Sequence, residues 1–354
     1  MEELVHPFDL LRLLYNTPAL EFLHVDVLIY EEPYMGTWQL PYDPIPLPLL
    51  RSLVFTDCPY ELLNLVLPHL SLPEDVFIRL QDISNYFPVQ LEGPPDAFPP
   101  LPIRPVTFLD VIMQGDELFM VADGPTSGLW LSAMHDLDGL PEPQNWGDWL
   151  LSLHECLTLT NVTCLHIFVE GCATFWPAFL SHLPQLTHLT ALFEESSDEP
   201  DPDSGAFDCP TATLCAALAP PDSGVPCSVL DTLTMEWPHE IVQEDFNNLP
   251  WILEMLKSRS RAGHPIRRVV ARVPLGPTFE QVQGLNFFEL HELIGTGCPP
   301  DTEYEVVEKP ETRRGMCVFE MREVWKVDGA DRYWEVGDRE KPHYDMVMSQ
   351  MFKE

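Results

Sequence analysis

A short motif with apolar residues at fixed spacing recurs along the chain and constrains its fold more than any other feature. The clearest copy runs from Leu50 to Cys58 and follows the pattern Leu-x-x-Leu-x-Leu-x-x-Asn/Cys, with Phe55 in the third apolar position. Five other copies keep the three apolar positions: Leu20, Leu23 and Val25; Val162, Leu165 and Ile167; Leu186, Leu189 and Ala191; Leu230, Leu233 and Met235; and Ile266, Val269 and Ala271. This spacing lets a short strand direct side chains into a core shared with its neighbours, so we expect stacked coils.

The segments between these strands have the apolar spacing of helices. Residues 60–70, 173–183 and 250–257 carry apolar side chains three and four positions apart. A strand followed by a helical return segment is the unit of a leucine-rich repeat. We therefore predict an α/β leucine-rich-repeat solenoid with parallel strands on its concave side and helices on its convex side.

The repeats are expected to form one domain over residues 1–275, with two interruptions. Residues 85–145 begin with a connector that holds seven prolines up to Pro105, and strands are predicted at 106–111, 117–122 and 128–134. Residues 194–208 are acidic and rich in Pro and Ser, which predicts a mobile loop. Residues 276–354 are expected to form a C-terminal extension with a β-hairpin at 317–336.

The charge of the chain excludes several classes of partner. Nineteen basic and 56 acidic residues give a net charge of −37, which repels nucleic-acid phosphates and anionic lipid. We find neither a signal peptide nor an apolar run of the ~20 residues that span a bilayer, so we expect an intracellular protein, in the cytoplasm or nucleus, that does not bind membranes.

The charge is also unevenly placed. No Lys or Arg occurs between Arg104 and Lys257, a stretch with 24 Asp and Glu residues. Six of the 19 basic residues then follow between Lys257 and Arg272. This basic cluster is either a docking patch or is neutralised by neighbouring acidic repeats, and we favour neutralisation.

Side chains between the apolar positions of each strand should face the concave side, where solenoids commonly bind their targets. If the last two predicted strands are adjacent, Glu236 meets Arg272. The candidate contact residues for a protein partner are Phe22, His24, Asp26, Val54, His166, Phe168, His188, Glu236, Arg268 and Arg272.

The sequence carries no motif typical of a catalytic or phosphate-binding site, such as Gly-x-Ser-x-Gly or His-Glu-x-x-His. We therefore expect no enzymatic activity and no cofactor. His166, His182 and His188 lie near one another in the repeat register, but no further ligand accompanies them, so we expect no metal. The alternative is an enzyme or small-ligand-binding protein with a site in residues 106–138, where Trp130, Met134, His135, Asp136 and Asp138 combine polar and aromatic groups.

Three segments carry a resemblance to a known family: Leu50 to Cys58, Leu67 to Pro73 and Met255 to Val269. Over about residues 15–275 the chain resembles the leucine-rich-repeat region of F-box proteins of mushroom-forming fungi (basidiomycetes). The resemblance implies a protein-binding module without catalysis of its own. In such proteins an F-box docks on the adaptor of a cullin-RING ubiquitin ligase, SCF type, while the repeats recognise the substrate. No F-box is recognisable here, so the adaptor is expected as a partner only if an F-box lies upstream.

Overall fold

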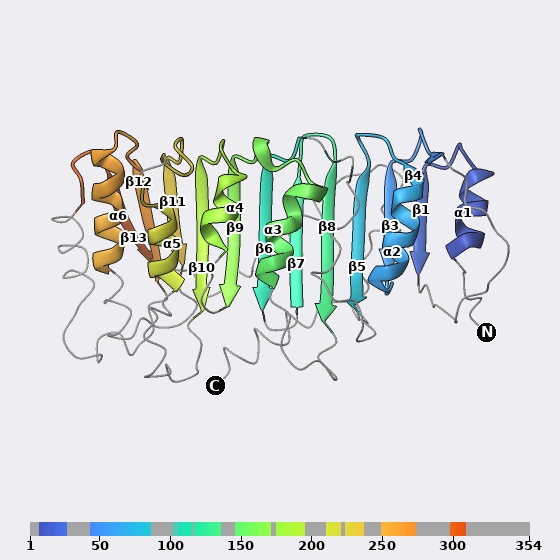
Figure 1. Ribbon diagram of the computed structural model, residues 1–354, viewed down its shortest axis with the longest axis horizontal. Coiled ribbons are helices and arrows are strands. Elements are labelled where there is room, and N and C mark those ends of the chain that lie inside the picture. Colours follow the sequence, from blue (N-terminus) through green and yellow to red (C-terminus); the bar gives the residue numbers. More distant parts are fainter. Residues whose placement is uncertain are drawn as a thin grey trace.

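The computed structural model describes residues 7–26, 43–85, 101, 103, 105–114, 117–135, 146–170, 175–194, 210–220, 224–236, 249–273 and 298–308. Eleven strands of these residues form one sheet, in the order β1-β3-β5-β8-β7-β6-β9-β10-β11-β12-β13 (Figure 1). The strands are β1 (Phe22–Asp26), β3 (Ser52–Thr56), β5 (Phe77–Asn85), β6 (Phe108–Gln114), β7 (Glu117–Asp123), β8 (Gly128–His135), β9 (Cys164–Glu170), β10 (His188–Glu194), β11 (Thr232–Glu236), β12 (Arg268–Val273) and β13 (Glu303–Glu308).

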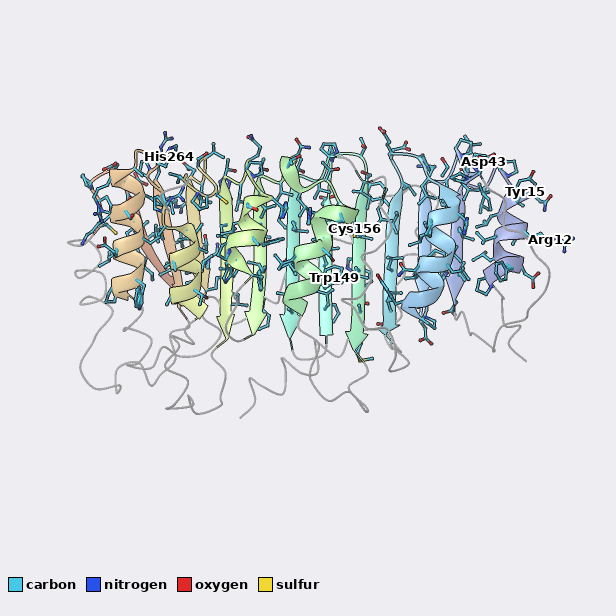
Figure 2. The ribbon with its side chains drawn as sticks, in the orientation of Figure 1. Arg12, Tyr15, Asp43, Trp149, Cys156 and His264 are labelled. Carbon is cyan, nitrogen blue, oxygen red and sulfur yellow. The ribbon has the colours of Figure 1, made fainter. Side chains whose placement is uncertain are left out.

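Helices cover one face of this sheet, and α1 lies at its β1 end (Figures 1 and 2). The helical elements are α1 (Pro7–Tyr15), α2 (Tyr60–Val66), η1 (Leu67–His69), α3 (Trp146–Cys156), η2 (Leu159–Asn161), α4 (Trp176–Ser181), α5 (Pro210–Leu218) and α6 (Leu249–Arg261). Two short strands, β2 (Ile45–Pro46) and β4 (Leu70–Ser71), pair separately. The fold is α/β with a large, mostly parallel sheet, as the sequence predicts at that level.

The apolar positions of the repeat lie in register from strand to strand. Leu23 of β1 pairs with Leu53 of β3, and the same position forms the series Leu165, Leu189, Leu233 and Val269 across β9 to β12. From Leu53 to Val269 these side chains are at most 1% exposed and belong to one core cluster that also holds helix residues. The six predicted strands are therefore confirmed, and they share a continuous core.

The strands predicted in the 85–145 insertion also form, and they complete the sheet. β6, β7 and β8 are an antiparallel meander. Its outer strands pair in parallel with the repeat strands, β8 with β5 and β6 with β9. Because Leu109, Met120 and Leu131 of the meander join the same core, the row of strands is unbroken.

Backbone hydrogen bonds at the amino ends of the strands fix this register. The carbonyl of Thr163 accepts from the N–H groups of Thr187 and His188 at 2.9 and 3.0 Å, and the carbonyl of Thr187 accepts from those of Asp231 and Thr232. The hydroxyl of Thr187 adds a bond to the Thr163 carbonyl at 2.9 Å. The first residues of successive strands are thus held at the same level.

The turn between β7 and β8 requires glycine at position 124. The Gly124 N–H donates to the Ser127 carbonyl at 2.9 Å. A Cβ on residue 124 would lie 2.3 Å from the carbonyl oxygen of Pro105, which is inside the contact distance of the two atoms.

Several predicted features lie outside the described residues. These are the acidic loop 194–208 beyond Glu194, parts of the 85–145 segment, and the hairpin at 317–336. Within the predicted extension 276–354, β13 is described, and it pairs in parallel with β12. The sheet therefore continues past residue 275.

Candidate binding face of the sheet

The face of the sheet opposite the helices, here called the outer face, carries the residues that alternate with the core positions. Strand geometry directs successive side chains to opposite faces. Because Leu53 and Phe55 of β3 belong to the helix-covered core, Ser52, Val54 and Thr56 belong to the outer face. All ten predicted contact residues occupy such positions, on β1, β3, β9, β10, β11 and β12.

Exposure divides the predicted contact residues into two groups. Val54, Phe168 and Glu236 are 1%, 6% and 8% exposed, so they offer little surface to a partner. The others are partly or fully exposed: Phe22, His24, Asp26, His166, His188, Arg268 and Arg272.

Val54 and Phe168 belong to an apolar stripe on the outer face that the repeat pattern did not predict. The stripe comprises Val54, Ile112, Phe119, Val121, Trp130 and Phe168, each buried and each outside the helix-covered core cluster. Strict alternation was visible in the sequence, but alternation identifies a face and does not reveal whether that face is covered. The centre of the sheet is thus buried on both faces, as parallel sheets commonly are.

A connected polar network lies where β5 meets β8. The Arg79 guanidinium is 4.7 Å from the ring centroid of Trp130, its register partner, and donates to the Gln81 side chain. The Gln81 amide donates to Asp82 at 3.1 Å, and the Asp82 N–H donates to the Ser132 hydroxyl at 2.8 Å. Asp82 has φ +52° at a register shift, which places this carboxylate beside Ser132.

This network bears on the alternative site in residues 106–138. Trp130 is 8% exposed and has Arg79 over its ring, whereas Met134 on the same strand is 48% exposed. Asp136, Asp138 and the side chain of His135 lie outside the described residues. Of the two described side chains of this alternative site, Trp130 is therefore packed under Arg79 and Met134 is open to solvent.

Two neighbouring strands keep an open surface between the buried centre and the C-terminal strands. This surface, the β9–β10 strip, comprises Cys164, His166, His188, Thr190 and Leu192, all exposed or half-buried. Thr190 is the register partner of His166, and His188 is the partner of Cys164. The strip brings together two of the predicted contact residues, His166 and His188.

Fixed contacts orient the side chains of the strip. The ring of Phe108 on β6 meets His166 edge to face with centroids 5.1 Å apart. The Thr187 hydroxyl lies 2.8 Å from Nδ1 of His188. Burial, and then the Asp110 charge, raise the pKa of the Cys164 thiol to about 11, so the thiol stays protonated and is a poor nucleophile.

The charged residues at the C-terminal end of the outer face are ion-paired with one another. Glu236 pairs with Arg272 across β11 and β12, as predicted from the register. Arg268 pairs with Glu305 of β13 at 2.7 Å, and this contact raises the pKa of the guanidinium. These pairs reduce the charge that the C-terminal strands offer to a partner.

The basic cluster at 257–272 is largely neutralised in the same way. Arg267 pairs with Asp231 at 3.5 Å and Arg261 pairs with Glu254 of its own helix. Arg259 is fully buried and bonded to backbone carbonyls. Of the two interpretations of this cluster, the described contacts favour internal neutralisation over a docking patch.

The three histidines weighed as metal ligands lie at two separate places. His166 and His188 lie on the outer face, while His182 caps the C-terminal end of α4 and stacks on His154 of α3, with centroids 3.9 Å apart. The described residues contain no group of three or more His, Cys, Asp or Glu side chains arranged to hold a metal ion.

Comparison of the chain with protein-family models, curated proteins and solved structures finds no match. Among the described helices, none combines the length and apolar character that crossing a membrane requires.

Proposed function

We propose that the chain is a leucine-rich-repeat solenoid that binds another protein through the outer face of its sheet and carries no catalysis of its own. The repeat spacing supports the solenoid, because equivalent apolar positions of successive copies are register partners in parallel strands. The helix layer over the opposite face supports it too (Figure 1). In solenoids the open strand surface commonly holds the target.

The observation that carries the proposal is the β9–β10 strip. Its imidazole, hydroxyl and apolar side chains stand on two strands whose positions are fixed by backbone hydrogen bonds on both sides. Side chains held on rigid strands lose little conformational entropy on binding, which favours recognition. A few well-positioned side chains usually supply most of the binding energy of an interface.

The resemblance to F-box proteins extends this proposal to a biological role. We propose that the chain, when an F-box accompanies it, presents a substrate to an SCF-type ubiquitin ligase in the cytoplasm or nucleus. Without an F-box, the same surface makes the chain a binding scaffold.

Photo-crosslinking from within the strip tests the proposed function. A photoreactive amino acid at Leu192, on the strip, should yield covalent adducts with a small set of proteins in cell extract. The matched control is the same amino acid at Ala216, an exposed position of α5 on the helix-covered face. Equal adducts from both positions would contradict binding through the outer face. The cullin adaptor among proteins that co-purify with the chain would support the ligase role.

A further inference from the structure

The β9–β10 strip lies in the most acidic part of the chain. Residues 105–256 contain 24 Asp and Glu residues and no Lys or Arg, and both strands belong to this stretch. A surface surrounded by one sign of charge attracts groups of the opposite sign over several ångströms, and the attraction is strongest where water is partly excluded.

Both strands of the strip end in a glutamate. The last residues of β9 and β10, Glu170 and Glu194, are register partners. In the sequence alone, residues 195–208 contain six further Asp and Glu residues and no basic residue.

The arginines of the outer face do not balance this charge within the described residues. Arg79 is 3% exposed and lies over Trp130. Arg268 and Arg272 are already engaged with Glu305 and Glu236. The exposed Arg51 lies over Phe22 at the β1 end of the sheet, several strands away from the strip, so a cationic partner at the strip meets little repulsion from the described arginines.

The strip also offers apolar contact for the stems of long cationic side chains. Leu192 is half-buried between Phe168 and Glu236, its register partners on the two sides. Phe108 presents its ring beside His166 at the other edge of the strip. Lys and Arg pack their methylene groups on such surfaces while their charged ends reach towards carboxylates.

We infer that the β9–β10 strip binds a Lys- or Arg-rich, extended segment of its partner protein. The inference rests on the proposed function and specifies the chemistry of the partner. Acidic segments and nucleic acid are rejected by the same field that attracts the basic segment.

Charge substitutions at Thr190 test this inference with defined probes. The probes are three labelled 12-residue peptides that alternate Thr with Arg, Gln or Glu, and binding to the full chain is followed by fluorescence anisotropy. We expect the arginine peptide to bind most tightly. Thr190→Arg should weaken its binding at least tenfold, whereas Thr190→Glu should leave it equal or tighter.

The matched control is Thr56, an outer-face residue of β3 with a similar half-buried side chain. Thr56→Arg and Thr56→Glu make the same charge changes away from the strip, and we expect each to alter affinity less than twofold. Equal effects at both positions would mean a diffuse attraction to the acidic chain and would overturn the inference. Thermal unfolding of each variant confirms that it is folded.

The remaining outcomes separate the inference from the proposed function. Tightest binding of the glutamate or glutamine peptide, or equal weakening by Thr190→Arg and Thr190→Glu, overturns the basic partner. If crosslinking from Leu192 is still selective in those cases, the proposed protein-binding function of the strip is supported although the partner is not basic. Loss of that selectivity overturns the proposed function itself.

Discussion

Arg259 of α6 is fully buried, and no described carboxylate pairs with it. Its guanidinium donates to the backbone carbonyls of Leu218, Pro226 and Cys227 at 3.0, 2.8 and 2.9 Å. Burial lowers the pKa of this guanidinium. The three carbonyls belong to the end of α5 and the turn before β11, so one side chain ties two coils together.

Replacing Arg259 by Met should cost more stability than its position on a surface helix suggests. Loss of the guanidinium leaves three carbonyls without their donor, so we expect the free energy of unfolding to fall by about 2–4 kcal/mol. Urea unfolding followed by circular dichroism measures it. Arg261→Met, two residues on and exposed beside Glu254, is the control and should cost about 0.5 kcal/mol or less. Equal losses from the two variants would show that the buried hydrogen bonds add nothing.

His182 should make the fold sensitive to mild acid. Burial, and then the neighbouring His154, lower its pKa below the ordinary value of 6.5. Glu155 is the carboxylate next to His154 on α3. Because the folded pKa lies below the unfolded value, the contribution of neutral His182 is complete above pH 6.5 and is lost as the pH falls below it.

The midpoint of thermal unfolding, recorded between pH 8 and pH 5, measures this effect. His182→Gln should flatten the fall of the midpoint below pH 6.5. His154→Gln should leave most of that fall, since burial is the larger cause of the shift. A His182→Gln profile as steep as that of the wild type would contradict the assignment.

Strands were predictable to different degrees, and the difference has a physical cause. The copies around Leu53, Leu165 and Leu233 keep an apolar residue at all three repeat positions, and each forms the expected strand. β5 and β13 were not found as repeats, because their sequences depart from the apolar pattern. In the β5 copy Asp75 stands at the first apolar position, and in the β13 copy the second position is the aromatic residue Tyr304. Both strands join the sheet by pairing with a neighbour that already presents its edge.

At the candidate site, alternation along each strand was enough to identify the outer face but not its exposure. Val54 and Phe168 occupy the predicted face and are buried, whereas His166 and His188 on the same face are accessible. The ion pair of Glu236 and Arg272 followed from adjacency of two repeats. The Arg79 and Asp82 network did not, because it depends on a register shift that no local sequence pattern marks.

The turn at Gly124 links the meander to the repeats, and it should tolerate no side chain. Gly124→Ala puts a Cβ against the Pro105 carbonyl, so the backbone must move, and we expect the free energy of unfolding to fall by about 2–3 kcal/mol. Gly263→Ala is the comparison, because Gly263 has φ +80° and open space around it; strain alone should cost about 1 kcal/mol there. Chemical denaturation ranks the two variants. A smaller loss at Gly124 than at Gly263 would mean that Pro105 yields easily.

At the scale of the whole molecule, one continuous sheet carries equivalent residues of the coils side by side. A chain with this charge repels itself, and the shared core must hold the coils together against that repulsion. The meander is the decisive part, because it joins the β1–β3–β5 strands to the β9–β13 strands. If it folded separately, the two halves would not share a surface.

The distance between the two edge strands tests this continuity most directly. Spin labels at His24 of β1 and Glu305 of β13, both exposed on the outer face, can be introduced as unnatural amino acids because the chain has nine cysteines. The eleven strands of the sheet place the two positions about 40–50 Å apart at about 4.8 Å per step. Pulsed electron-electron double resonance should give one narrow distribution in that range. A broad distribution, or a main distance below about 30 Å, would contradict the continuous sheet.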